Sequence, residues 1–483
     1  MWLALLVCAA VPPERAMEKA LREAAAVSCP KRPIEIDPDL SRAARSFVAG
    51  VQEGRSPLLA SALSFYAGLE STAPASLGSV ATISPPSRAD RAVGDLIPKV
   101  CGFDRAGIAA GEIPGGRAVV ALLTASQPMR LRPIPGRVAA GSEVTIDGQL
   151  GPGLRNPRLF VSQPGGTIEE RPLKAAGSRV TAKVRFPRKG EATIELLATG
   201  SGGPQVVAIR RIFVGTSPPR SPPPEQSGRD PGVKGVEASI AMLRTQHGLP
   251  SLRRDAELDA VAELHSREMA RTGTFAHVLA SDGSVGDRLD RAGYTRKAAG
   301  ENIGLSETPL AAHEGIESSP AHLANLLDPR FSHLGLGIAR GPSPDGSEGI
   351  YLTEVLASPV RGSKDPEAEV LRALQRRRDQ LRLAPLERDG ALDEAARKGI
   401  QQAAFRGSAL SRTEQGTTVR ALLDHDQRFE SAAAETYVVS SPDEIASRNA
   451  AERSWTRVGV GALYKSSKDY GPGRLWVLIV FAR

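Results

Sequence analysis

Apolar residues follow two periods along this chain, and the shorter period dominates residues 126–216. RVTAKVRF (179–186) places an apolar residue at every second position, as a half-buried β-strand does. Four further runs, EVTIDGQL, PRLFVSQ, EATIELLA and VVAIRRIFV, occur at intervals of about 8–14 residues, with glycine, proline and asparagine between them. This spacing predicts an immunoglobulin-like β-sandwich over residues 126–216.

A helical period begins after residue 247. The apolar face of the predicted helix consists of Leu258, Val261, Ala262, His265 and Met269. Asp255 stands where an N-cap is expected, because its carboxylate can accept hydrogen bonds from the first free N–H groups. We expect His265, on this apolar face, to be buried with its hydrogen bonds satisfied.

The same helical pattern recurs at an offset of 134 residues. Residues 248–273 align without a gap on 382–407, and HLGLGIA (333–339) aligns on RVGVGAL (457–463). A fainter third copy is suggested by IEIDPDLSRAARSF (34–47). The pattern indicates internal repeats, with coincidental leucine spacing as the alternative, above all for the first copy.

These patterns divide the chain into segments. Residues 217–234 are rich in proline and predict an extended linker. The other boundaries are 1–15 for an export signal, 16–125 for the first repeat, 235–360 for the middle repeat and 361–483 for the last. About three or four domains are also what the length of 483 residues predicts.

The first residues and the cysteines indicate the compartment. MWLALLVCAAVPPERA contains a short apolar stretch typical of a secretory signal, although it lacks the usual positive charge before it. Cys8 could carry a lipid, but the bulky Val7 before it disfavours that. In an exported protein Cys29 and Cys101 would form one disulfide; in a cytosolic protein they would be two buried thiols. No later stretch is long enough for a transmembrane helix.

Six of the seven histidines lie between His247 and His333, and histidine is well suited to bind metals or transfer protons near neutral pH. The surrounding motifs, in order, are LRTQHGLPSL, LDAVAELHSREMA, FAHVLASDGSVGDRLDRAGY, AGENIG, SSPAHLANLLDPRFSHLGLGIA and IYLTEVLA. Their order over residues 240–357 resembles the CAP superfamily (cysteine-rich secretory, antigen 5 and pathogenesis-related type 1 proteins), most of all its cysteine-poor bacterial SCP-like branch.

The resemblance implies an α-β-α sandwich with a shallow polar cleft. The fold class is therefore expected to be α+β multidomain, with one or more such sandwiches beside the immunoglobulin-like domain. By motif, the cleft residues are His277, Glu301 and His322. Tyr351 occupies the place of a second cleft histidine found in fuller members of the family and is expected to approach the cleft, next to Glu354 and Asn302.

The resemblance also implies the chemistry of the cleft. Two imidazoles and a carboxylate could hold a divalent metal (Zn, Mg or Ca) with open coordination positions, or form only a hydrogen-bonded cluster. His313 is interpreted as a surface residue. The last repeat lacks the FAH, GEN and SPAH motifs, so it is expected to have no such cleft.

Three functions remain. The first is an exported binding module, periplasmic, cell-surface or extracellular, whose cleft takes a small amphiphile, a peptide, a glycan fragment or another component of the cell envelope. The second is a metal-dependent hydrolase or peptidase using His277, Glu301 and His322. The third is a structural or adhesive envelope protein with a vestigial cleft. No nucleic acid is expected, because the net charge of +8 includes no dense basic run, and no nucleophile motif for an enzyme appears.

Overall fold

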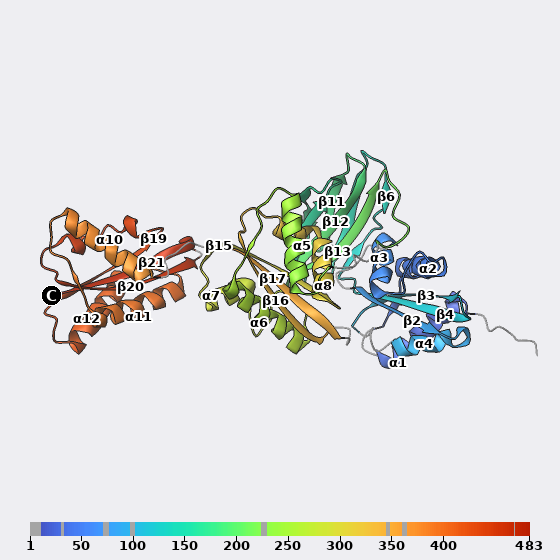
Figure 1. Cartoon of the computed structure of the whole chain (residues 1–483), viewed down its shortest axis with the longest axis horizontal. Coiled ribbons are helices and arrows are strands. Elements are labelled where there is room, and N and C mark those ends of the chain that lie inside the picture. Colours follow the sequence, from blue (N-terminus) through green and yellow to red (C-terminus); the bar gives the residue numbers. More distant parts are fainter. Residues whose placement is uncertain are drawn as a thin grey trace, which may run out of the picture.

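The computed structural model describes residues 11–29, 33–70, 77–96, 102–223, 229–343, 348–359, 365–467 and 469–483. They form four units (Figure 1). The third unit is central: the C-terminal unit lies on one side of it, and the first two units lie on the other. None of the helices in these ranges is both long enough and apolar enough to cross a membrane.

The first unit is a four-stranded sheet in the order β1-β3-β4-β2 with helices on both faces. One core contains residues of α1 and α4, and a second contains residues of α2 and α3. The elements are α1 (Glu14–Ser28), β1 (Glu35–Ile36), α2 (Pro38–Gln52), α3 (Ala60–Glu70), β2 (Leu77–Ser84), α4 (Ala89–Leu96), β3 (Arg105–Ile113) and β4 (Arg117–Ala125).

The second unit consists of two sheets around one core, in the orders β10-β11-β7-β5 and β6-β13-β12-β8-β9. The five runs predicted as strands form β7, β8, β11, β12 and β13; the immunoglobulin-like class of this unit stays a prediction. The elements are β5 (Met129–Leu131), β6 (Arg137–Val138), β7 (Glu143–Leu150), β8 (Arg155–Ser162), β9 (Ile168–Arg171), β10 (Lys174–Ala176), β11 (Arg179–Arg185), β12 (Gly190–Gly200) and β13 (Gly203–Val214).

The third unit again has helices on both faces of a four-stranded sheet, in the order β14-β16-β17-β15. Its first helix begins at Val233, inside the segment predicted as linker. The elements are α5 (Val233–Gln246), β14 (Arg253–Arg254), α6 (Ala256–Thr272), α7 (Val285–Arg291), β15 (Arg296–Ser306), α8 (Pro309–Glu317), α9 (Pro320–Leu326), β16 (His333–Pro342) and β17 (Glu348–Pro359).

The fourth unit has the sheet order β18-β20-β21-β19. In this unit, as in the first and third, a two-residue edge strand pairs in parallel and the other pairings are antiparallel. The elements are α10 (Pro366–Gln380), β18 (Glu387–Arg388), α11 (Gly390–Arg406), α12 (Arg412–His425), β19 (Ala432–Val439), β20 (Arg457–Ser467) and β21 (Gly471–Ala482).

A close contact between one helix and one strand recurs in these three units. In the third, a Cβ atom on Gly335 of β16 would lie 2.2 Å from the backbone carbon of Leu258 in α6. A Cβ atom on Gly459 would lie 2.1 Å from the backbone carbon of Leu392 in the fourth unit, and one on Gly107 would lie 2.2 Å from that of Leu40 in the first. Only glycine allows this approach, because any side chain would occupy the space of the helix backbone.

The helix in this contact also begins in the same way each time. The carboxylate of Asp255 accepts hydrogen bonds from the N–H groups of Glu257 and Leu258, which confirms the predicted N-cap of α6. Asp389 caps α11 and Asp37 caps α2 through equivalent bonds. Each cap satisfies backbone donors that the first helical turn leaves free.

The third and fourth units share a buried arginine that binds backbone carbonyls. Arg244 is fully buried and donates to the carbonyls of Pro250, Leu326, Asp328 and Phe331. Arg378, 134 residues later, donates to those of Ala384, Ala450, Glu452 and Trp455. Burial lowers the pKa of both guanidinium groups from the usual value. Five N–H donors in a planar fork suit this role, since one side chain can satisfy several loop carbonyls.

Some expectations fall outside the described ranges. The signal segment is undescribed up to residue 10, including Cys8, and so is Cys101. Cys29 is disulfide-bonded and lies in the core beneath α1.

The glycine contact leads to a stability prediction. Gly335→Ala should lower the free energy of unfolding by about 3 kcal/mol, because the added methyl group meets backbone that cannot rotate away. Hydrogen exchange of peptides from α6 and β16 in the full-length protein measures the change locally.

Gly315→Ala is the matched control. Gly315 lies within α8, and a Cβ there would have no heavy atom within 4 Å, so the substitution should stabilise the helix by about 1 kcal/mol. Equal effects of the two substitutions would contradict the role given to Gly335.

Candidate functional site

Three side chains from different elements converge beside the sheet of the third unit. His277 lies in the loop after α6, Glu301 in β15 and His322 in α9. The Nδ1 atom of His277 is 2.9 Å from Oε1 of Glu301. The imidazole rings of His277 and His322 are inclined by 26° to each other, with centroids 6.2 Å apart. The structure thus brings together the three residues expected in the cleft.

Glu301 is buried among positively charged and hydrogen-bonding groups. Its second carboxylate oxygen accepts from the guanidinium of Arg288, a residue of α7. Burial by itself would raise the pKa of Glu301, but the hydrogen bond from His277, with the nearby charges, holds it below the usual value. Glu301 is therefore a carboxylate, and both of its oxygens are engaged.

Behind Glu301 lies a second layer of charge. Arg288 also contacts Asp282, whose other oxygen is 2.7 Å from Nδ1 of His265. His265 is fully buried, and its Nε2 is 3.1 Å from the carbonyl oxygen of Ala276. It is the satisfied, buried histidine that its place on the helix face predicts, and it holds the loop that carries His277.

His322 occupies the opposite side of the site and remains uncharged. Burial, with a smaller contribution from His277, lowers the pKa of His322 to about 3. Its Nδ1 atom is 2.7 Å from the hydroxyl of Ser319, which caps α9. The backbone carbonyl of His322 accepts from the amide of Asn302.

The second unit forms one wall of the site. A cavity of about 400 Å³ contains His277, Glu301 and His322 in its lining. The wall from the second unit consists of Arg158, Phe160, Leu197 and Pro204. The two units also join directly: the N–H of Val278 donates to the carbonyl of Gly202. The site is a pocket between two units rather than an open cleft on one.

Two expected neighbours of the cleft lie behind it. Glu354 is fully buried, accepts from the amide of Asn302, and lies 2.6 Å from Nδ1 of His313. Asn302 in turn accepts from Asn325. Neither Glu354 nor Asn302 is in the lining of the pocket; they link β17 and β15 to the helix that carries His322.

The interpretation of His313 as a surface residue is wrong. It is fully buried in α8, with Nδ1 2.6 Å from Glu354 and Nε2 2.8 Å from Glu317. Burial alone would lower the pKa of His313, but these two carboxylates outweigh it and raise it to about 9. The sequence did not reveal this because the partners lie 41 and 4 residues away, one of them on another element.

The expectation that the Tyr351 hydroxyl reaches the cleft is also wrong. Tyr351 is fully buried in β17, and its hydroxyl donates to the carbonyl of Pro342 at 2.6 Å. The ring packs among apolar residues that include Met269 and Ile303. This tyrosine therefore fills the core.

His277, Glu301 and His322 are poorly arranged to hold the metal ion that was expected in the cleft. The described ranges contain no group of three or more histidine, cysteine, aspartate or glutamate side chains arranged to hold a metal ion. The carboxylate of Glu301 is already shared between His277 and Arg288, and a guanidinium beside it repels a divalent cation. A three-ligand site of His277, Glu301 and His322 does not fit this arrangement.

The fourth unit has apolar residues where the third has its charges. If the glycine contacts are aligned, the strand pairings place Ala434 at the position of Glu301 and Ile479 at that of Glu354. Gly399, at the offset of 134, stands in the place of His265. The same fold is therefore built there without the polar cluster.

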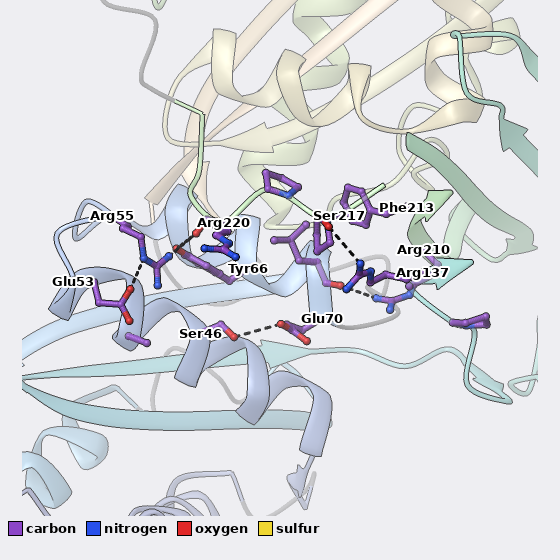
Figure 2. Close-up of a pocket in the computed structure, with 16 residues that line it drawn as sticks. Ser46, Glu53, Arg55, Tyr66, Glu70, Arg137, Arg210, Phe213, Ser217 and Arg220 are labelled. Carbon is purple, nitrogen blue, oxygen red and sulfur yellow. Dashed lines mark hydrogen bonds and ion pairs between the residues drawn. The ribbon is translucent and has the colours of Figure 1, made fainter. Parts of the chain in front are cut away.

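A second cavity, of about 950 Å³, lies between the first unit, the second unit and the segment after β13 (Figure 2). Arginine and glutamate side chains line it, but they bond within its wall: Arg55 contacts Glu53 and the carbonyl of Arg220, and Arg137 contacts Ser217. This cavity contains no histidine among the described residues that line it.

The residues missed by sequence reasoning are those that orient the predicted ones. Arg288 lies in the FAHVLASDGSVGDRLDRAGY motif and Ser319 in the SSPAH motif, so both belong to segments that carry the family resemblance. Glu195, whose carboxylate contacts Ser319 across the unit boundary, carried no signal, because it is one polar residue in a strand 124 residues away.

The buried His313 predicts a stability that depends on pH. Its pKa rises from about 6.5 in the unfolded chain to about 9 in the fold, so its contribution is complete below pH 6.5 and is lost as pH rises through 9. The shift corresponds to about 3 kcal/mol. His313→Gln should remove this dependence, as measured by denaturant unfolding between pH 6 and 9.5.

His425→Gln, at the exposed end of α12, serves as the control and should leave the profile unchanged. A wild-type profile that is flat over this range would show that the buried charge contributes no net stability.

Comparisons with known proteins agree with the geometry of the third unit. Residues 238–355 match the model of the CAP family, the cysteine-rich secretory protein family. Two relatives come from Bacillus subtilis (strain 168): the uncharacterized membrane protein YlbC is 38% identical over 100 residues, and the uncharacterized protein YkwD is 33% identical over 116. These alignments cover 20% and 23% of this chain, and 29% and 45% of the relatives, so the chain spans less than half of either.

Solved structures are also similar at low identity. An extracellular SCP-domain protein from Bacillus anthracis is 18% identical, with a TM-score of 0.24 over 48% of this chain and 89% of that one. An outer surface protein from Borrelia burgdorferi is 18% identical, with a TM-score of 0.23 over 26% of this chain and 92% of that one. By the family match, residues 238–355 of this chain form a CAP domain of the cysteine-rich secretory protein family.

Proposed function

We propose that this protein is an exported binding module whose pocket holds a small ligand with hydroxyl or ammonium donors next to an apolar part. A small amphiphile, a glycan fragment or a peptide has this chemistry. The observation that carries the proposal is that two imidazoles line a pocket of about 400 Å³ together with the apolar side chains of Phe160, Leu197 and Pro204 from the second unit.

The imidazoles supply hydrogen-bond acceptors. His277 uses Nδ1 toward the carboxylate of Glu301, which can only accept, so the ring donates there. In its neutral form its Nε2 then carries a lone pair. His322 is neutral, since its pKa is about 3, and it too has one acceptor nitrogen. A ligand with two donor groups would match this pair.

The wall from the second unit supports an apolar part of the ligand. Phe160, Leu197 and Pro204 line the same cavity as the two histidines. The guanidinium of Arg158 lies 4.7 Å from the ring centre of Phe160 and holds one face of that ring. A cavity of this volume is within the usual range for small-ligand sites.

The proposal also includes export of the protein and a role for the first and fourth units. The disulfide at Cys29 favours an oxidising compartment. The first and fourth units repeat the sheet order of the CAP domain, and the fourth has Ala434 and Ile479 in place of the charged residues. We infer that both are copies that present the central pocket rather than bind the ligand.

Binding can be tested by calorimetric titration with three probes: the β-1,4 disaccharide of N-acetylglucosamine, a monoacylglycerol and a tripeptide. We expect one of the three to bind wild type, and His322→Phe to bind it about fivefold more weakly, because one hydrogen bond contributes about 1 kcal/mol. The ring of phenylalanine keeps the shape of the pocket.

His333→Phe is the control, because His333 lies on β16 outside the pocket; it should leave the affinity unchanged. No binding of any probe, together with stoichiometric Zn²⁺ binding that His322→Phe abolishes, would favour the metal-dependent hydrolase instead. Absence of both would favour the structural role.

A further inference from the structure

We infer that Glu195 of the second unit is a positioning residue that sets, through Ser319, which nitrogen of His322 carries the proton. The inference rests on the proposed function in that His322 faces the ligand. It assigns the second unit a part in orienting His322, beyond that of forming a wall of the pocket.

Glu195 is buried at the boundary between the two units. It lies in the middle of β12, flanked by Phe160 of β8 and Ile209 of β13, with no exposed surface. Its Oε1 accepts from the hydroxyl of Ser319 at 2.5 Å, and its Oε2 accepts from the N–H of Ala321 at 2.6 Å. A buried carboxylate requires such partners, because burial without them is costly. Here both partners belong to the CAP domain.

The single hydroxyl proton of Ser319 then determines which tautomer His322 adopts. Ser319 has one hydroxyl proton, which it donates to the carboxylate of Glu195. Its oxygen, 2.7 Å from Nδ1 of His322, can therefore only accept from that ring. The neutral ring must carry its proton on Nδ1, and Nε2 is left as the acceptor nitrogen.

The carboxylate can also take up a proton. Burial raises the pKa of Glu195 to about 7, although the bonds from Ser319 and Ala321 oppose the rise. A protonated Glu195 would donate to Ser319, whose hydroxyl would then donate to Nδ1 of His322, moving the ring proton to Nε2.

Among the described residues, none forms an ion pair with Glu195 that would compete with Ser319 and Ala321. The neighbouring helix contributes the neutral His322. On the surrounding strands, Arg158 pairs with Glu170, Arg171 with Glu169 and Arg211 with Glu191. Arg210 of β13 donates to the carbonyls of Ile134 and Leu69.

The test compares the tautomer of His322 in wild type and Glu195→Gln. The full-length protein, labelled with ¹⁵N-histidine, is studied by long-range ¹H–¹⁵N NMR at pH 8.5 without ligand, and His322→Phe identifies the signal. Wild type should show a protonated Nδ1. In Glu195→Gln the amide oxygen can accept from Ala321 and its N–H can donate to Ser319, so the proton should appear on Nε2.

Glu191→Gln, on the same strand but in an exposed ion pair with Arg211, is the matched control and should keep the wild-type tautomer. Ser319→Ala provides a second route, since it removes the connection and should leave a mixture of tautomers. A protonated Nε2 in wild type, or a tautomer unchanged by both Glu195→Gln and Ser319→Ala, would overturn the inference.

The measurement is made without ligand, so it is independent of the proposed binding. If the tautomer changes as expected but none of the three probes binds, the inferred role of Glu195 is supported and the proposed function fails. If a probe binds but the tautomer is unchanged, only the inferred role of Glu195 fails.

Discussion

The contact between α6 and β16 is the constraint on which the CAP domain depends. At Gly335 and Gly337 the helix backbone lies where a side chain would otherwise be, so the backbones of helix and strand are in direct contact. Asp259 strengthens the contact by accepting from the N–H of Leu336. This packing fixes the position of His265, and through Asp282 and Arg288 it fixes Glu301 and the loop of His277.

The side chains of the site form chains in which each buried charge contacts the next, since an unpaired charge in the interior would be costly. On one side the chain runs from His265 through Asp282 and Arg288 to Glu301. Behind the sheet a second chain runs from Glu317 through His313 and Glu354 to Asn302, which holds the backbone of His322. Glu301, in the pocket lining, thus orients His277, whereas Asn302 holds His322 from outside that lining.

The third and fourth units share their packing contacts but differ at the charged positions. Arg244 and Arg378 bind loop carbonyls in the same way, and the glycine contacts match. The charged positions do not match, because Ala434 and Ile479 replace Glu301 and Glu354. Packing requirements act on every copy that must fold, so the third and fourth units share the glycine contacts although only the third has the polar cluster.

The sequence by itself determined the local features and the family of residues 238–355. The strands from 143 to 214, the cap at Asp255 and the convergence of His277, Glu301 and His322 all follow from short patterns or motifs. The tertiary structure alone decided the burial of His313, the core position of Tyr351, the pairing of Arg288 with Glu301 and the approach of Glu195 to Ser319. Those contacts join elements distant in sequence, and the cost of burying charge selects partners by position in space, which the local pattern of residues does not contain.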